Sequence, residues 1–289
     1  MTRKPVRKTA LFTLLILLAG GLWVNTASAA DQSVIPDFSK SLYRSPMNGE
    51  MNTYLRPGDG PTLVLVPGTW GGIWRFESLI AALPQSMSIA VVELSWQDGH
   101  KPKTLNLTME GLADDVLQAI DALGISQFVI AGHSIGGMIA VEIAGRDVPG
   151  LVGAIPMEGW THHTVVATAF DGVVVDDLSP EEEAARQADR IRGRSHLSEA
   201  ELHAIGSIWK TWNGYAGLER ATIPILELWG DRGKAHPDRK ALQIPERSNI
   251  RIGWIPQASH LMLMEDPAEV ARQVRKFMTN LRAATSKTK

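Results

Sequence analysis

The sequence predicts an α/β protein, with a mostly parallel central sheet flanked by helices and an inserted helical cap. Two observations lead to this class. Short runs of consecutive apolar residues alternate along the chain with segments whose apolar residues recur at helical spacing. Strands that are apolar throughout have both faces buried, as in a parallel sheet covered by helices. The alternation is interrupted at residues 160–221, where only the helical pattern is present.

The expected strands and helices follow one another in the order of a parallel sheet. Strands are predicted at 61–68, 88–95, 127–132, 151–159, 224–230 and 249–256. Helices are predicted at 72–83, 108–124, 137–146 and 268–278. Thr108 is a candidate N-cap of the second helix, and Gly124 ends it. These segments assign residues 30–159 and 222–289 to one core domain.

Residues 160–221 are expected to form the cap. Ser179 is a candidate N-cap followed by Pro180 at the first helical position, and Ser198 and Glu201 have the spacing of a capping box. The second helix carries an apolar stripe that we expect to dock the cap onto the core, formed by Leu202, Ile205, Ile208, Trp209 and Trp212.

Residues 1–29 have the composition of a secretory signal peptide. Basic residues within the first eight positions precede an apolar run at 10–24, and Ala27-Ser28-Ala29 forms a cleavage site. The run is barely long enough to span a membrane and contains two glycines, so cleavage is expected rather than anchoring. The protein is therefore expected to be periplasmic or secreted, and to meet the membrane only during export.

Charge and cysteine content exclude several function classes. The leader holds four basic residues and no acidic one, so its removal leaves 25 Lys and Arg against 31 Asp and Glu. A net charge near −6 argues against a nucleic-acid partner bound through a basic face. The absence of cysteine excludes disulfides, thiol catalysis and cysteine-ligated zinc.

The segment Gly132-His133-Ser134-Ile135-Gly136 lies between a predicted strand and a predicted helix. A serine hydroxyl is a poor nucleophile, so it needs a base within hydrogen-bond reach and a tight, exposed turn that a substrate carbonyl can approach. The G-x-S-x-G pattern in this context is typical of such a turn, because the flanking glycines allow strand and helix to come close. Ser134 is therefore predicted to be a nucleophile.

Three segments resemble the α/β-hydrolase family: LVLVPGTWGG (63–72), GHSIGG (132–137) and PQASHLMLMEDPAEV (256–270). The resemblance extends from about Met47 to Met278. It implies an oxyanion hole formed by the backbone N–H groups of Thr69 and Ile135, although this chain has Pro67-Gly68 where the family usually has His-Gly. The turn that carries Ser134 corresponds to the family's nucleophile elbow. A serine at this position also argues against the halide- and epoxide-opening relatives, which have Asp at the elbow.

His260 follows the last predicted strand and is the expected base, since imidazole titrates near neutral pH and can take and return the serine proton. His133 is expected to pack around the elbow. His162 and His163 are expected to be polar lining at the cap entrance rather than metal ligands, and no metal site is predicted.

A serine nucleophile and a histidine base need a third residue, an acid that orients the histidine, to complete a catalytic triad. Two carboxylates are candidates for this acid. In the resembled family the acid usually comes two residues after a Trp-Gly strand end, where this chain has Gly233. Asp231 lies two residues earlier and could reach His260 if the loop bends. Some family members instead carry the acid after the strand that follows the elbow helix, which is the position of Glu158. A carboxylate at the end of an apolar strand is costly unless it has a role, so Glu158 is preferred.

These residues predict an exported serine hydrolase that cleaves a small carboxylic ester, lactone or amide through an acyl-enzyme, without a cofactor. The expected partner is this small-molecule substrate. An aromatic pocket is predicted from Trp70, Trp74, Trp160, Trp209 and Trp212. Two alternatives are a cofactor-free perhydrolase or haloperoxidase-like activity, and a non-catalytic small-molecule binding protein on the same fold.

Overall fold

The computed structural model describes residues 37–175 and 178–286. The predicted signal peptide, residues 1–29, lies outside this range. Within the described ranges, no helix is both long enough and apolar enough to cross a membrane.

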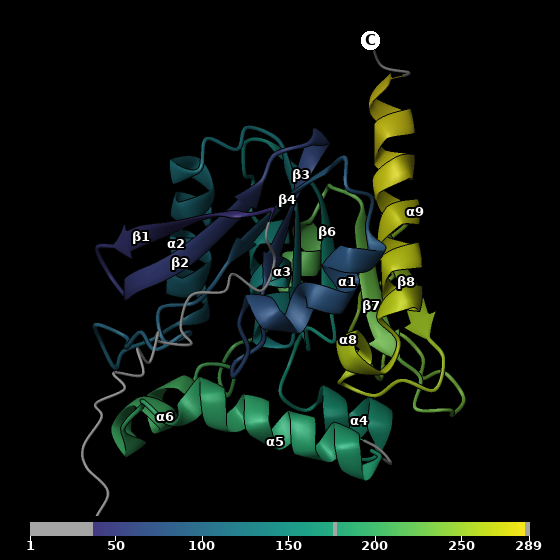
Figure 1. The fold of residues 1–289 in the computed structure, drawn as a ribbon. Coiled ribbons are helices and arrows are strands. Elements are labelled where there is room, and N and C mark those ends of the chain that lie inside the picture. The colour runs from purple at the N-terminus through teal and green to yellow at the C-terminus, as the bar shows by residue number, and fades with distance from the viewer. Residues whose placement is uncertain (1–36, 176–177, 287–289) are drawn as a thin grey trace, which may run out of the picture. The chain divides into compact units, whose positions relative to one another are not determined.

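An eight-stranded sheet forms the centre of the described chain (Figure 1). Its strands are β1 (Ser39–Ser45), β2 (Gly49–Arg56), β3 (Asp59–Val66), β4 (Met87–Val92), β5 (Phe128–His133), β6 (Leu151–Met157), β7 (Ile225–Gly230) and β8 (Ile250–Ile255). The spatial order is β1-β2-β4-β3-β5-β6-β7-β8. The pairs from β4 to β8 are parallel, and only the β1–β2 and β2–β4 pairs are antiparallel. The predicted fold class is confirmed.

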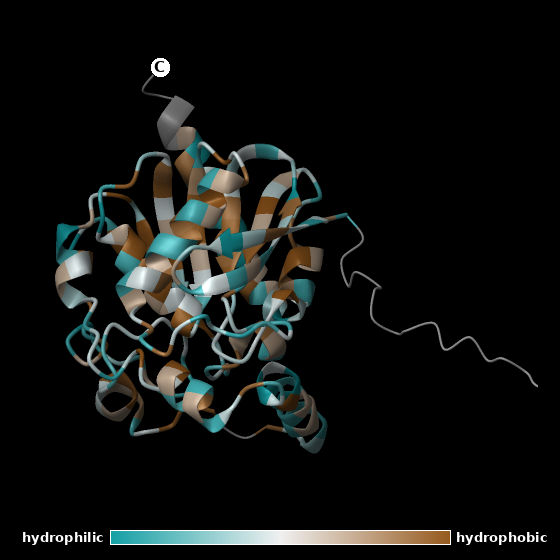
Figure 2. Ribbon diagram, turned by 90° about the vertical axis from the view of Figure 1, so that its left-hand side faces the viewer, coloured by the Kyte–Doolittle hydropathy of each residue, from teal (hydrophilic) through white to brown (hydrophobic). Residues whose placement is uncertain are grey.

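Helices cover both faces of the sheet and bury two apolar clusters. One cluster joins α2 (Met109–Ala122) and α3 (Ile135–Ala144) to one face, and the other joins α1 (Glu77–Ala82) and α9 (Pro267–Ser286) to the opposite face. Side chains along a strand alternate between them: in β3, Val64 and Val66 belong to the first cluster, while Leu63 and Leu65 belong to the second. Apolar residues accordingly concentrate in the strands (Figure 2).

Four helices lie between β6 and β7 in the described chain, within the segment predicted to be a cap. They are α4 (Val165–Phe170), α5 (Pro180–Arg194), α6 (Glu199–Ile205) and α7 (Tyr215–Arg220). Ser179 and Ser198 each form a complete capping box, with the glutamate three residues later. In Figure 1, α4, α5 and α6 lie across the edge of the sheet where β7 and β8 end.

The structure differs from the sequence prediction in strands β1 and β2 and in helix α6. The antiparallel strands β1 and β2 were not predicted, and they extend the sheet beyond β4. Helix α6 ends at Ile205, whereas the predicted apolar stripe continues through Trp212.

The register of the parallel strands brings their carboxyl ends together. His133 of β5 pairs with Met157 of β6, and Gly230 of β7 pairs with Ile255 of β8. Residues that follow these positions therefore share one edge of the sheet, which is where open α/β sheets bind ligands. Ser134, Glu158 and His260 all come from segments that follow strands at this edge.

Candidate active site

Ser134 occupies the turn between β5 and α3 with a left-handed backbone, φ 58° and ψ −121°. Its N–H donates to the carbonyl oxygen of Met157, at 3.0 Å. The flanking glycines are required sterically, since a Cβ on Gly132 would overlap the backbone of Gly136, and a Cβ on Gly136 would overlap that of Val66. The turn is strained and closely packed, as expected of a nucleophile elbow.

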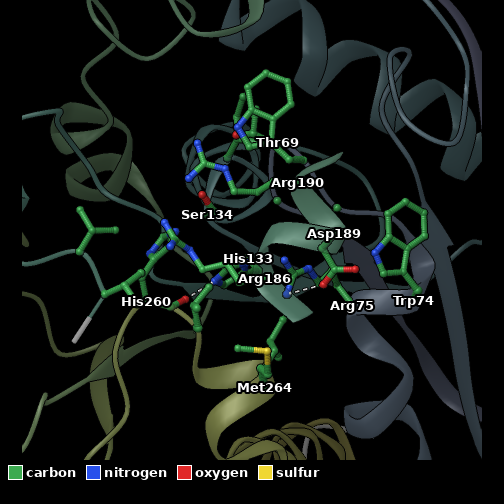
Figure 3. Close-up of a pocket in the computed structure, with 18 of the residues that line it drawn as sticks. Thr69, Trp74, Arg75, His133, Ser134, Arg186, Asp189, Arg190, His260 and Met264 are labelled. Carbon is green, nitrogen blue, oxygen red and sulfur yellow. Dashed lines mark hydrogen bonds and ion pairs between the residues drawn. The ribbon is translucent and has the colours of Figure 1, made fainter. Parts of the chain in front are cut away.

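His260 lies between β8 and the short helix α8 (Met262–Glu265), and it lines the same cavity as Ser134 (Figure 3). Its Nδ1 is 3.2 Å from Oε2 of Glu158. The backbone is fixed from two sides: its N–H donates to the carbonyl oxygen of Val174, and its own carbonyl accepts from Nε2 of His133 at 2.6 Å. With Nδ1 directed to Glu158, Nε2 is left for the serine proton.

Glu158 directly follows β6 with φ 49°, and its side chain is fully buried. Nη1 of Arg232 donates to Oε1 at 2.9 Å and Nη2 donates to Oε2 at 3.1 Å, while the N–H of Gly230 donates to Oε1 at 3.1 Å. Burial alone would raise the pKa of this carboxyl group, but the hydrogen bond from His260 and the contacts with Arg232 lower it to about 2. Glu158 is thus a carboxylate at neutral pH.

Asp231 has a different role in the structure. Its Oδ1 accepts from the N–H groups of Gly233 and Gln257, at 2.8 and 2.7 Å, and its Oδ2 is 3.5 Å from Nε2 of His236. Asp231 therefore joins the loop after β7 to the loop after β8. The structure brings Glu158, and not Asp231, to His260.

Thr69 and Ile135 line the cavity together with Ser134. The N–H of Ile135, at the first position of α3, has no acceptor within the helix. The loop that carries Thr69 is held by side chains that follow β4: Nε1 of Trp96 donates to the carbonyl of Thr69 at 2.8 Å, and Nε2 of Gln97 donates to that of Gly68 at 2.7 Å. Trp96 and Gln97 belong to no local sequence motif, and these two supports were not predicted.

The cavity has a volume of about 380 Å³, which suits a small molecule. Trp70, Trp74, Trp160 and Trp209 line it as predicted, together with Met138, Val174, Val175, Leu261, Leu263 and Met264. The prediction for Trp212 is wrong, because its indole points to α3, where Nε1 donates to Oε2 of Glu142 at 2.9 Å. The cavity also contains charged residues that were not predicted, namely Arg75, Arg186, Asp189 and Arg190.

The remaining histidines do not form a metal centre. His133 packs beside the elbow as predicted, and burial lowers its pKa to about 3, so it is neutral. His162 and His163 contact each other at a ring distance of 4.1 Å, and neither is among the residues that line the 380 Å³ cavity. Among the residues that the structure describes, no group of three or more histidines and carboxylates could hold a metal ion.

Several known proteins are similar in sequence to this chain. The putative carbamate hydrolase RutD of Stutzerimonas stutzeri is 27% identical over 229 residues, which cover 74% of this chain and 83% of the relative. A soluble epoxide hydrolase of Corynebacterium is 26% identical over 83% of this chain and 98% of its own length. The match to RutD of Enterobacter cloacae, 30% identical, covers only 36% of this chain and 40% of that relative.

Solved structures share the fold at lower identity. The carboxylesterase CesB of Bacillus subtilis superposes with a TM-score of 0.65 at 19% identity, covering 85% of this chain and 93% of that one. The enol-lactonase of Burkholderia xenovorans superposes with a TM-score of 0.64 at 16% identity, covering 83% and 100%. The model of the alpha/beta hydrolase family matches residues 63–273, which include the elbow, Glu158 and His260, and the chain therefore belongs to the alpha/beta hydrolase family.

Proposed function

We propose that this protein is an exported serine hydrolase that cleaves a small carboxylic ester, lactone or amide through an acyl-enzyme. One observation carries the proposal: Ser134, on a strained turn, shares a cavity with His260, whose Nδ1 contacts the buried carboxylate of Glu158 at 3.2 Å. A nucleophile, a base and a group that orients the base are the parts that acyl transfer to serine requires.

In the proposed first half-reaction, Oγ of Ser134 attacks the carbonyl carbon of the substrate while Nε2 of His260 accepts the hydroxyl proton. The carbonyl oxygen becomes an oxyanion that accepts hydrogen bonds from the N–H groups of Thr69 and Ile135. His260 then gives the proton to the departing alkoxide or amine as the bond to the carbonyl carbon breaks. Glu158 stabilises the imidazolium throughout and stays ionised.

In the second half-reaction, water attacks the acyl-serine, and His260 accepts the proton of the water. Collapse of the second tetrahedral intermediate returns that proton to Oγ of Ser134 and releases the carboxylic acid. The net reaction consumes one water and needs no redox partner.

The similar proteins support ester or amide chemistry, since they include a putative carbamate hydrolase, an sn-1-specific diacylglycerol lipase and a putative esterase/lipase. The similarity to a soluble epoxide hydrolase suggests epoxide opening as a second reading. Serine at position 134, in place of the Asp that the family resemblance implies for epoxide-opening relatives, favours acyl transfer.

Labelling with a fluorophosphonate probe tests the nucleophile, because only an activated serine reacts. We expect stoichiometric labelling of the wild type and none of Ser134→Ala. Ser78 is a matched control, since it lines the same cavity from α1; Ser78→Ala should be labelled like the wild type. Labelling that survives Ser134→Ala would overturn the assignment, and absence of labelling in the wild type would favour a binding protein.

Export is the part of the proposal that rests on the leader sequence alone. Cleavage after Ala29 would leave Ala30 at the N-terminus, and cleavage after Ala30 would leave Asp31. Intact mass of the protein recovered from the periplasm of an expressing cell tests this, and a mass that includes Met1 would contradict it.

A further inference from the structure

Charged side chains form one wall of the cavity. Arg186, Asp189 and Arg190 project into it from α5, where their spacing of three and four residues places them on one helix face, and Arg75 lines it from the 3-10 helix after β3 (Ile73–Phe76). Three guanidinium groups and one carboxylate line the site. The cavity is thus positively charged, although the chain without its leader is acidic.

Two of the three arginines have carboxylate partners. Nη1 of Arg75 lies 3.0 Å from Oδ2 of Asp189, and Nη1 of Arg186 contacts both carboxylate oxygens of Glu183, at 3.1 and 2.8 Å. Arg190 is half-buried, and no hydrogen bond or ion pair joins its side chain to the part of the chain that the structure describes. Glu183 acts on it only over a longer distance.

The guanidinium group of Arg190 therefore has N–H donors available, and a bound anion would accept hydrogen bonds from them. A guanidinium group suits a carboxylate best, because its two parallel N–H groups match the two oxygens. In the view of Figure 3, Arg190 lies on the same side of the cavity as Ser134, whereas the Arg75–Asp189 pair lies beside Trp74.

The position of Arg190 is fixed by direct packing of α5 on the loop after β3 that carries Thr69 and Trp70, called the oxyanion loop below. Gly193, one turn further along the helix, lies so close to Trp70 that a Cβ would overlap the Trp70 backbone. The guanidinium carbon of Arg192 lies 3.7 Å from the ring centroid of Trp74, and that of Arg194 lies 5.0 Å from the ring centroid of Trp70. Arg190 is therefore held at a set distance from Thr69 and from the nucleophile.

Apart from the charged wall and the catalytic residues, much of the lining is apolar, with Trp160, Trp209 and Met138 among its members. We infer that the substrate is amphiphilic: an ester or amide with a hydrocarbon or aromatic part and a free carboxylate near the scissile carbonyl, bound by Arg190. This inference rests on the proposed hydrolase function and narrows its substrate class. We place the carboxylate on the acyl side, so that the substrate is a monoester or monoamide of a dicarboxylic acid, which hydrolysis converts to a dicarboxylate and an alcohol or amine.

The test compares two esters of equal acyl length, mono-para-nitrophenyl adipate and para-nitrophenyl hexanoate, which differ in the terminal carboxylate. We expect kcat/KM of the wild-type protein to favour the adipate ester by roughly tenfold to a hundredfold, the range for one hydrogen-bonded charge pair. The preference should shrink as sodium chloride is added, because salt screens charge pairs that solvent reaches.

Arg190→Gln should bring the ratio of the two kcat/KM values close to one. Arg275→Gln, on an exposed position of α9 outside the cavity, removes the same charge and should keep the wild-type ratio. Circular dichroism and Tm establish that both variants are folded. Equal kcat/KM values for the two esters in the wild type, or a preference that survives Arg190→Gln, would overturn the inference.

The hexanoate ester separates this inference from the proposed function. Hydrolysis of hexanoate that depends on Ser134, without a preference for adipate, would leave the hydrolase function intact and refute the carboxylate site. If neither ester is hydrolysed, the proposed function fails, and calorimetry with phenylbutyrate and phenylbutyramide decides the anion site on its own. Tighter binding of phenylbutyrate that is lost in Arg190→Gln supports the site, and equal binding refutes it.

Discussion

Arg232 holds both carboxylate oxygens of Glu158 in an ion pair from which solvent is excluded. The two hydrogen bonds are 2.9 and 3.1 Å long, and the side chains are 1% and 0% exposed. Arg232 also donates from Nη1 to the carbonyl of Gly230 and from Nε to that of Val173, and its guanidinium stacks 3.7 Å from the ring centroid of Phe170. Arg232, in the loop after β7, therefore holds the Glu158 carboxylate in position and keeps it ionised.

Glu158→Gln should lower kcat by about 10⁴, because the neutral amide cannot stabilise the imidazolium of His260 or fix its tautomer. KM should change little. Asp231 lies in the loop after β7 and does not contact His260, so kcat of Asp231→Asn should stay within a few-fold of the wild type. Steady-state kinetics with a para-nitrophenyl ester measures both. The reverse ranking would make Asp231 the acid of the triad.

Arg232→Gln should make the protein more sensitive to acid. Because the pKa of Glu158 in the folded state is lowered to about 2 from an ordinary 4.5, its ionised form stabilises the fold above about pH 4.5, and this contribution is lost as the pH falls toward 2. Without Arg232 that pKa rises, so acid unfolding should begin at a higher pH. Removing one partner of a buried ion pair should also cost about 3–5 kcal/mol at neutral pH.

Arg44→Gln is the matched control for that measurement. Arg44 pairs with Glu50 at 2.9 Å on the exposed strand β1, where an ion pair contributes about 0–1 kcal/mol. Acid titrations of the two variants, followed by far-UV circular dichroism, should therefore separate clearly. Coincident titration curves would contradict the stabilising role of Arg232.

Glu227→Gln should stabilise the protein, and more so at higher pH. Burial raises the pKa of this β7 carboxyl group to about 8, and the opposing effects of Trp229 and Arg239 are smaller. The folded state therefore holds a proton that the unfolded state has lost, and stability falls as the pH rises from about 4.5 to about 8. Urea unfolding at several pH values should show the gain of the variant growing over this range.

Glu246 provides the control for Glu227, since its side chain is 85% exposed. Glu246→Gln should change the unfolding free energy little and by the same amount at every pH. A gain for Glu227→Gln that does not vary with pH would mean that the buried carboxyl group does not titrate in this range.

The parts of the molecule that were predicted from sequence are those with a local pattern. The buried strands are continuous apolar runs, and Ser134 lies in a motif that needs both of its glycines. Strand β1 was missed because it is almost entirely exposed, so it pairs through its backbone without an apolar period. Strand β2 is mostly buried, but its buried run includes the polar residues Asn52 and Thr53, so it has no continuous apolar pattern. Trp212 was misplaced because α6 ends at Ile205, and the helical phase that put it on the stripe does not continue.

The charged wall of the cavity has no signal in the sequence. Arg186, Asp189 and Arg190 have the composition of an ordinary solvated helix face, and only the approach of α5 to the oxyanion loop makes them part of the site. That approach depends on Gly193, which lies inside a helix, where a glycine is usually unfavourable. Gly193 has a negative φ, so its backbone conformation does not require glycine. A glycine at such a helix position indicates a close backbone contact, but it does not identify the charged residues beside it as part of the site.

Gly193→Ala tests whether this contact positions the cap helix. Alanine favours a helix by about 1 kcal/mol over glycine, so propensity alone predicts a rise in Tm. The added Cβ would instead overlap the backbone of Trp70, and α5 must move away from the loop that carries Thr69. We expect a lower Tm and a loss of roughly tenfold or more in kcat/KM, since a small misplacement of positioning groups is costly. Gly217→Ala is the matched control, because Gly217 lies in cap helix α7 and its Cβ would meet its nearest neighbour at 3.7 Å, an ordinary contact. If both variants gain stability and keep their activity, α5 does not need its close approach to the oxyanion loop.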